Sequence, residues 1–281
     1  MLSLRKPSWL KKKIEFDSSR QTSLLLKKIG VNTVCKEAKC PNLSECFKRS
    51  HATFLILGKH CTRNCRFCNV EKGKPQELDT EEHLKVAEAV EKLDLKHVVV
   101  TSVTRDDLAD GGAEMFAKTV QAIRKTTSVE LLIPDLAGNE DAIKKIALSS
   151  PSILGHNIET VPRLYNLRPG ANYARSLYVL KHAKKINKNV LTKSALMLGL
   201  GECQEEVINV MQDLISIKCD FLALGQYLRP SLKACEVAEY IEPEVFDRYK
   251  KAGLDMGFKH IEAGPFVRSS YRAIDYFSTG I

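Results

Sequence analysis

HVVVTS, at residues 97–102, is a short run of mostly apolar and β-branched residues. The stretches on either side of it, 79–93 and 116–123, instead carry apolar residues at helical spacing. A strand that is apolar along most of its length and lies between helices is typical of a parallel sheet buried on both faces. The stretch therefore predicts an α/β fold.

The same alternation of strand and helix continues along the chain. We expect further strands at Phe54–Leu57, Val129–Ile133, Ile153–Ile158, Leu191–Leu198, Phe221–Leu224 and His260–Ala263. We expect helices around Arg20–Ile29, Asp141–Leu148, Ser176–Asn187, Glu205–Ile217 and Pro243–Met256, with the rest of the first fifty residues irregular.

About six strand–helix units fit between residues 51 and 265, whereas a closed eight-unit barrel typically needs about 250 residues. We therefore expect a partial (β/α)6 TIM-like barrel at 51–265, with an N-terminal extension at 1–50 and a C-terminal segment at 266–281. An open doubly wound sheet is the rival, and periodicity does not separate the two.

Composition excludes several classes of protein. The chain has 281 residues, of which 44% are hydrophobic and 27% charged, so it can bury an ordinary core. Its apolar runs are far shorter than the roughly 20 residues of a membrane span, and residues 1–13 lack the apolar stretch of a secretory signal. We expect a cytoplasmic protein with no membrane partner.

The net charge of +9 is spread over the chain, with lysines often beside acidic residues. This pattern suits a partner with an acidic surface; nucleic acid or an ordinary solvated basic surface are the other interpretations.

Six of the nine cysteines lie between residues 35 and 68. Cys61, Cys65 and Cys68 have the spacing C-x3-C-x2-C and follow an expected strand, at the sheet edge where such folds bind ligands. Three thiolates on one loop can each bind a different iron of a cubane and leave the fourth iron open. Zinc would need a fourth protein ligand, so we favour an iron–sulfur cluster over structural zinc or free thiols.

Cys35, Cys40 and Cys46 form a second triplet with the spacing C-x4-C-x5-C. This differs from the plant-type ferredoxin spacing, C-x4-C-x2-C with a distant fourth cysteine. A second cluster with a non-cysteine fourth ligand fits the triplet better.

The loop CTRNCRFC at 61–68 resembles the signature of the radical S-adenosylmethionine (SAM) enzymes. In that superfamily, SAM chelates the open iron, and an electron from the cluster cleaves it to a 5′-deoxyadenosyl radical. From about Arg5 to Ala273 the chain resembles the lipoyl synthases. The motifs that carry this resemblance are CKEAKCPNLSEC (35–46), TSVTRDDLADGGA (101–113), GHNIETVPRLYNLRPGANY (155–173), KSALMLGLGE (193–202), GQYLRPS (225–231) and GPFVRSSYRA (264–273).

The resemblance implies two [4Fe–4S] clusters and SAM as cofactors. Cys61, Cys65 and Cys68 would hold the cluster that binds SAM. The auxiliary cluster would be held by Cys35, Cys40, Cys46 and a serine of Arg268-Ser269-Ser270-Tyr271, for which we choose Ser270. The residues expected to bind SAM are Phe67, Thr101, Ser102, Gly111, Gly112, Asn157 and Glu159, with Arg168, Lys193 and Gln226 as weaker candidates.

The implied reaction inserts two sulfur atoms, at C6 and C8, into an octanoyl chain on a lysine of a lipoyl carrier domain. The auxiliary cluster is the sulfur donor, and two SAM molecules are the radical sources. No side chain is expected to act as a catalytic acid or base, because an unactivated C–H bond has no acidic proton.

The implied carriers are the glycine cleavage H protein and the E2 subunits of 2-oxoacid dehydrogenases. A ferredoxin- or flavodoxin-type reductant and an iron–sulfur carrier protein are the other implied partners, and we expect no nucleic-acid partner.

Two alternatives differ in what they predict. Another radical SAM enzyme would use Cys35–Cys46 for an electron-relay cluster that survives turnover. A zinc-bearing nucleic-acid binder would contain zinc and bind with a steep salt dependence.

Overall fold

A computed structural model gives the fold and describes residues 5–12, 20–49, 51–123 and 126–278. One eight-stranded sheet has the order β1 to β8, which is also the order along the chain. The first strand pairs antiparallel with the second, and all later pairs are parallel. The strands are β1 (Asn32–Thr33), β2 (Thr53–Ile56), β3 (His97–Ser102), β4 (Ser128–Leu132), β5 (Ile153–Gly155), β6 (Leu191–Leu198), β7 (Phe221–Gln226) and β8 (His260–Gly264).

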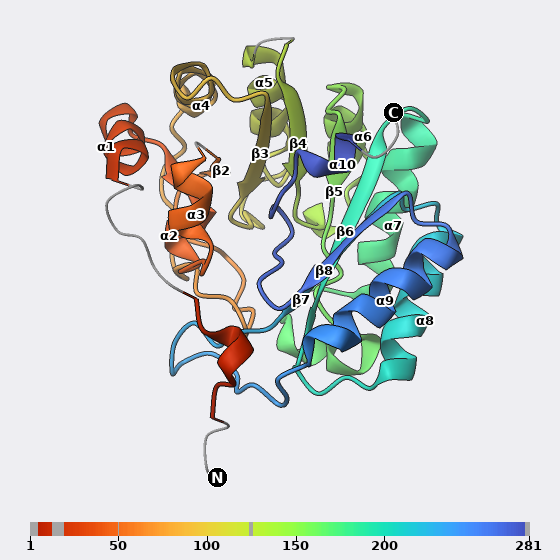
Figure 1. Ribbon diagram of the computed structural model, residues 1–281. Helices are drawn as coiled ribbons and strands as arrows, with labels where there is room; N and C mark the ends of the chain where they lie inside the picture. Colours follow the sequence, from red (N-terminus) through yellow and green to blue (C-terminus); the bar gives the residue numbers. More distant parts are fainter. Residues whose placement is uncertain (1–4, 13–19, 50, 124–125, 279–281) are drawn as a thin grey trace.

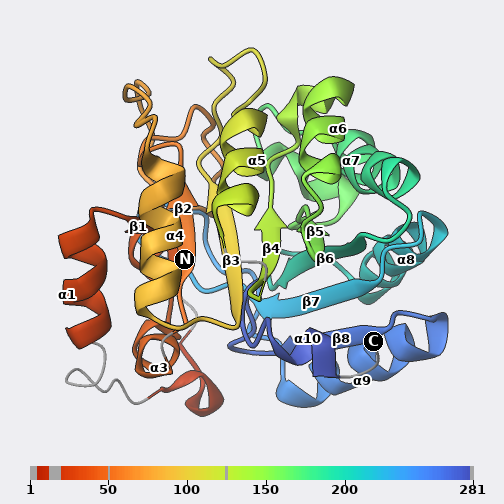
Figure 2. The same cartoon turned by 90° about the horizontal axis from the view of Figure 1, so that it is seen from above.

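One long helix connects each pair of neighbouring parallel strands. These helices are α4 (Glu82–Lys92), α5 (Ala113–Ala122), α6 (Glu140–Leu148), α7 (Tyr173–Ile186), α8 (Gln204–Ser216) and α9 (Pro243–Met256). All of them lie on the outer side of a curved sheet (Figures 1 and 2). A doubly wound sheet would carry helices on both faces and reverse its strand order. The structure therefore confirms the partial barrel of six strand–helix units.

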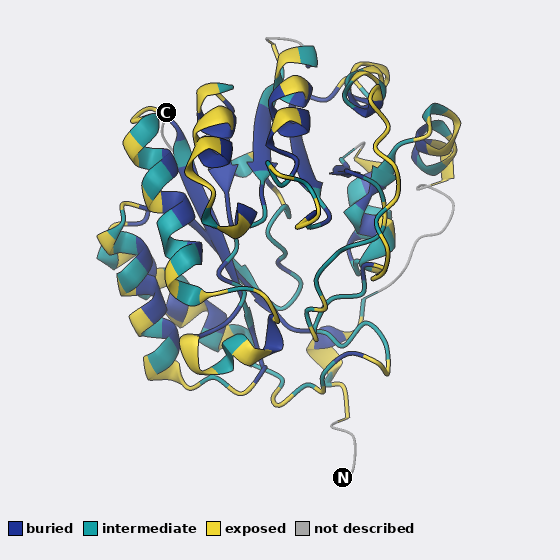
Figure 3. Cartoon of the chain, turned by 180° about the vertical axis from the view of Figure 1, so that it is seen from behind, coloured by how far each residue is buried: buried dark blue, intermediate teal, exposed yellow. Residues whose placement is uncertain are grey.

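Burial explains why the strands form where the sequence predicts them. Val98, Val99 and Val100 in β3 are all at most 4% exposed. Each helix turns a buried face to the sheet and an exposed face outward (Figure 3). The core thus lies between the helices and the sheet, and the carboxyl ends of the strands share one edge, the barrel mouth.

Two expectations need correction. Strand β5 ends at Gly155 rather than at Ile158, so residues 156–159 belong to the mouth. The first fifty residues are less irregular than expected: besides η1 (Ser8–Leu10) and α1 (Arg20–Ile29), the structure contains α2 (Val34–Glu37) and α3 (Leu43–Lys48). Helices of four and six residues are too short to show helical periodicity.

The C-terminal segment enters the barrel instead of covering it from outside. Val267 packs against Ala195 of β6 and Ala223 of β7, and its carbonyl lies so close to Gly225 that a Cβ there would be 2.1 Å away. The segment runs from the end of β8 back to α10 (Asp275–Ser278) at the opposite end of the strands (Figure 1). The interior of the partial barrel is therefore filled by this chain's own C-terminal segment.

A buried ion pair lies at the far end of that segment. Lys193 of β6 contacts both carboxylate oxygens of Glu130 of β4 at 3.0 Å, and both side chains are at most 1% exposed. The Lys193 ammonium also lies 3.8 Å from the ring centroid of Tyr276. We call this end of the barrel, opposite the mouth, the floor. Removing one partner of a buried ion pair costs folding free energy, so these groups hold the floor together.

Among the described residues, no helix has the length and apolar character needed to cross a membrane.

Gly112, the N-cap of α5, provides a test of the packing. Its φ is +90°, and a Cβ would lie 2.2 Å from a methyl group of Leu57. We expect Gly112→Ala to destabilise the protein by about 2–5 kcal/mol, from left-handed backbone strain plus steric overlap, as measured by anaerobic denaturant unfolding.

Gly257→Ala is the matched control, because Gly257 has φ +110° and open space around the Cβ position. It should cost only the strain, about 1–2 kcal/mol. Equal losses in the two variants would contradict the packing account.

Candidate active site

The loop with Cys61, Cys65 and Cys68 leaves the carboxyl end of β2 and folds back on itself at the barrel mouth. The Cys61 amide donates to the carbonyl of Glu71 at 2.8 Å, and the Cys68 amide donates to the carbonyl of Cys65 at 3.2 Å. All three cysteines are partly exposed and free. The loop thus presents three thiols from one short turn at the mouth.

Arg63, inside this loop, anchors it to the next two strand ends. Its guanidinium contacts Asp106, after β3, at 2.8 Å and Asp135, after β4, at 2.7 Å. The Asp135 side chain is fully buried and also contacts Arg175 at 2.8 Å. Burial would raise the pKa of Asp135, but the hydrogen bond and charge of Arg63, with the charges of His156 and Arg175, lower it to about 2.

Two charged residues from other elements face the cysteine loop. Burial raises the pKa of Cys65, an effect that the charge of Arg168 opposes and the charge of Glu159 reinforces. Burial raises the pKa of Cys68 to about 11, and Glu159 again adds to the increase. Glu159 and Arg168 therefore lie within electrostatic reach of these thiols.

Asn157 and Glu159 follow β5 and point toward each other. The Asn157 amide nitrogen donates to Oε1 of Glu159 at 3.0 Å. Glu159 has a left-handed φ of 68°, and burial raises the pKa of its carboxyl group. A strained backbone at a non-glycine residue is often found at binding sites, and here the bonds of the Glu159 main chain to Ala195 and Met197 of β6 hold it.

The other expected SAM residues divide by what they contact. Ser102 at the end of β3 has a buried hydroxyl with no hydrogen-bond partner among the described residues, which suits a ligand contact. The Thr101 hydroxyl, by contrast, already donates to the carbonyl of Leu132 at 2.8 Å. Gly111 and Gly112 have positive φ and no room for a Cβ, so packing explains both glycines.

Phe67 packs in an apolar cluster with Leu167, Leu200 and Tyr227 beside the loop.

The weaker candidates make structural contacts. Arg168 donates to the main-chain carbonyls of Asn157 and Ile158, so it supports the loop after β5. Gln226 donates to main-chain carbonyls at the mouth. Lys193 lies in the floor ion pair, on the far side of the barrel interior from the mouth.

The N-terminal cysteines meet the C-terminal segment in one cavity. It is lined by Cys35 of α2, Cys46 of α3 and Cys40 between these helices, together with Arg268 and Ser270. Burial raises the pKa of Cys46 to about 12, and the charges of Cys35 and Cys40 add to the increase. The three thiols are therefore close neighbours, although they come from separate elements.

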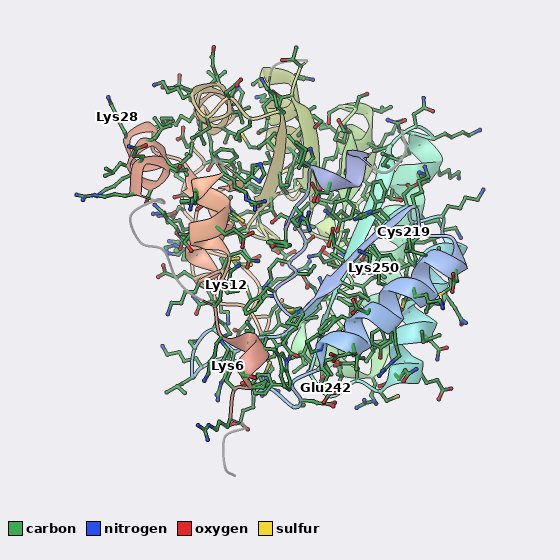
Figure 4. The ribbon with its side chains drawn as sticks, viewed as in Figure 1. Lys6, Lys12, Lys28, Cys219, Glu242 and Lys250 are labelled. Atoms are coloured by element: carbon green, nitrogen blue, oxygen red, sulfur yellow. The ribbon has the colours of Figure 1, made fainter. Side chains whose placement is uncertain are left out.

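Polar contacts fasten the C-terminal segment to these helices. The Asn42 amide donates to the carbonyl of Phe266 at 2.7 Å, and the Tyr271 hydroxyl donates to Glu45 at 3.1 Å. Lys12 reaches Glu45 at 2.7 Å and lies over the rings of Phe266 and Tyr271; Figure 4 shows it below α2 and α3.

The two serines of the Arg268–Tyr271 motif point to different sites. Ser270 lines the cysteine cavity and accepts a hydrogen bond from the Thr53 hydroxyl at 2.8 Å. Ser269 donates to Oδ1 of Asn157 at 2.9 Å.

The donor chemistry of both triplets suits iron–sulfur clusters, because free cysteine thiols are the soft ligands that such clusters take. Within the described residues, no group of three or more His, Cys, Asp or Glu side chains could hold one metal ion. Arg268 also suits an anionic cluster, because this partly buried guanidinium lies near Cys40; burial lowers its pKa and the charge of Cys40 opposes that shift.

Sequence reasoning missed Arg63, Asp135 and Thr53 as supporting residues. The position of Arg63 between two cysteines was a signal, but its acidic partners come from other loops that only the fold brings together. Thr53, as a β-branched strand residue, gave no signal at all.

Comparisons with known proteins agree with this geometry. Residues 55–214 match the radical SAM superfamily. Among solved structures, a methylornithine synthase aligns with 89% of this chain and 79% of its own at a TM-score of 0.55 and 12% identity. The Streptococcus suis protein SuiB, bound to its precursor peptide, aligns with 89% of this chain and 54% of its own at a TM-score of 0.58 and 11% identity. These structural likenesses concern the fold alone.

The fold and the cysteine loop thus define a radical SAM enzyme. Two relatives are closer in sequence, and both are lipoyl synthases. The protein of Caldanaerobacter subterraneus is 55% identical over 275 residues, covering 97% of each chain, and that of Geotalea uraniireducens is 53% identical over 279 residues, covering 98% of this chain and 99% of its own. The chain belongs to the lipoyl synthase family. It is a sulfur-inserting enzyme whose cofactors are [4Fe–4S] clusters and SAM.

The anchor of the cysteine loop can be tested at Asp135. Asp135→Asn should cost about 3–5 kcal/mol of unfolding free energy, because it leaves Arg63 and Arg175 without a buried counter-charge. Asp106→Asn is the matched control. Its 39% exposed carboxylate should be worth about 0–1 kcal/mol.

The lowered pKa of Asp135 also predicts that its contribution to stability depends on pH. Since the folded-state pKa of Asp135 is about 2 against an ordinary 3.8, its contribution is fully present above 3.8 and is lost as the pH falls toward 2. The difference in stability between wild-type and Asp135→Asn apoprotein should shrink over that range. A difference that stays constant down to pH 2 would count against the assignment.

Proposed function

We propose that the two cysteine triplets hold the two clusters of a lipoyl synthase. Cys61, Cys65 and Cys68 would bind the cluster that takes SAM. The auxiliary cluster would bind Cys35, Cys40, Cys46 and Ser270. The observation that supports this assignment is the single cavity that the N-terminal cysteines share with Ser270.

When bound, the first cluster and SAM would supply the radical that removes hydrogen from C6 and C8, and the auxiliary cluster would supply the sulfur. The protein's own residues orient and shield these groups. Asn157, Glu159 and the unpaired hydroxyl of Ser102 would bind SAM. Phe67 would contact its adenine, while Thr101, Gly111 and Gly112 would shape the loop beneath it.

The chain would accordingly divide into three working parts. Residues 1–50 bring the auxiliary cysteines, 51–265 form the radical SAM barrel, and 266–281 bring Ser270. Because the proposed chemistry needs the six cysteines of the two triplets to stay reduced, we propose a cytoplasmic location.

For the substrate we propose an octanoyl group on a lipoyl carrier domain, either the glycine cleavage H protein or an E2 subunit. Lys72, Lys74 and Lys233 are exposed on the loops after β2 and β7. These two loops meet, since the Cys235 amide donates to the carbonyl of Arg66 at 2.8 Å. Exposed lysines at the mouth would attract an acidic carrier domain. A ferredoxin- or flavodoxin-type reductant and an iron–sulfur carrier protein would complete the cycle.

The cluster assignment predicts an iron count. Anaerobically reconstituted wild type should hold about eight irons and eight sulfides per chain, and a Cys35/Cys40/Cys46→Ala variant about four of each. The matched control is Cys203→Ala, which changes an exposed cysteine outside both triplets and should leave the count near eight. Wild type with only four irons would rule out the auxiliary site.

The docking proposal predicts a charge effect. Reversing Lys72, Lys74 and Lys233 to Glu should weaken binding of an octanoylated carrier about three- to tenfold at low salt, and added salt should shrink the difference. Binding can be measured by anaerobic titration calorimetry.

The control reverses Lys144, Lys181 and Lys185, which are exposed on α6 and α7 along the outside of the barrel. Equal effects of the two triple variants would show that only net charge matters, and would remove the proposed docking surface.

A further inference from the structure

Ser269 makes a contact that ligand binding by Ser270 does not require. Its hydroxyl donates at 2.9 Å to Oδ1 of Asn157, a residue 112 positions earlier in the chain. Its neighbour Ser270 bonds instead with Thr53 beside Cys35. Two consecutive side chains of one segment thus reach the two sites separately.

The contact fixes how Asn157 is oriented. An asparagine side chain has one accepting end and one donating end. Here the amide nitrogen donates to Glu159, so the oxygen is left to accept from Ser269. Without the Ser269 hydroxyl, only the bond to Glu159 would hold the Asn157 amide, so its orientation would be less restricted.

Glu159 carries the connection to the cysteine loop. It lies within electrostatic reach of Cys65 and Cys68, and its strained backbone is pinned between two strand residues. A short chain of hydrogen bonds therefore runs from the C-terminal segment, through Ser269 and Asn157, to the carboxylate that faces the first cysteine loop.

Hydrogen bonds also tie the C-terminal segment to the N-terminal helices on both sides of the two serines. Asn42 holds Phe266 from the side of the N-terminal helices, and Tyr271 binds Glu45 of α3. Because Ser269 and Ser270 are adjacent and share these anchors, we expect a change in how the N-terminal cysteines hold Ser270 to move Ser269 as well.

We propose that Ser269 is a positioning residue that couples SAM binding to the state of the auxiliary site. When the auxiliary cluster binds Ser270, the segment is held so that Ser269 orients Asn157 and Glu159 for SAM. Coupling between two sites is reciprocal. Bound SAM must therefore favour binding of Ser270 at the auxiliary site to the same extent. This inference rests on the proposed cluster assignment.

A double-mutant cycle on SAM affinity tests the inference. The four proteins are wild type, Ser269→Ala, the Cys35/Cys40/Cys46→Ala variant and their combination, each counted for iron and titrated anaerobically with SAM. Because one hydrogen bond is at stake, Ser269→Ala should keep about eight irons but bind SAM about two- to tenfold more weakly. Ser269→Thr, which restores the hydroxyl, should recover most of the affinity.

The cycle itself carries the decisive prediction. Loss of the auxiliary cysteines should weaken SAM binding when Ser269 is present and have little further effect in the Ser269→Ala background. Equal effects in both backgrounds would overturn the coupling, and so would wild-type affinity in Ser269→Ala. If Ser269→Ala lost four irons while Ser270→Ala kept eight, Ser269 would be the ligand and the inference would also be wrong. Wild type with only four irons would overturn the cluster assignment and this inference together.

Discussion

The packing of residues 265–276 inside the partial barrel is the constraint on which the site depends. The segment is held at one end by Asn42 and at the other by Tyr276, which lies over the Glu130–Lys193 ion pair. Between these anchors Ser270 lines the cavity of the N-terminal cysteines. A barrel of six units leaves its interior open on one side, and this chain fills that space with the segment that carries Ser270.

The two sites are built in different ways. The first belongs to a single loop, which Arg63 anchors to the strand ends at the mouth. The second combines α2, α3 and a segment from the far end of the sequence, so it exists only when the whole chain has folded. A cluster used as a sulfur source must be dismantled and rebuilt. The oxygen ligand that we propose, Ser270, would be a weaker partner for iron than a thiolate, which suits that requirement.

Much of the fold was predictable because most of its strands are buried on both faces. Such strands form short apolar runs, and His97–Ser102 and Leu191–Leu198 have the bounds that the pattern predicts. The cysteine spacings likewise indicated two clusters, and resemblance to a family supplied the serine. The arrangement at Ser269 could not be predicted, because its partner Asn157 lies on another strand end and hydrogen bonds between distant loops leave no local pattern. The same holds for Arg63 and Asp135. The short helices α2 and α3 were missed because helices of four and six residues are too short to show a helical period.

The origin of the inserted sulfur tests the central claim most directly. The protein would be reconstituted with 34S-sulfide, freed of unbound sulfide, and given SAM, a reductant and an octanoylated carrier for a single turnover. Mass spectrometry of the carrier should show 34S at both positions in the wild-type product and no lipoyl product from the Cys35/Cys40/Cys46→Ala variant. Unlabelled sulfur in the wild-type product, or lipoyl formation by the variant, would contradict the account.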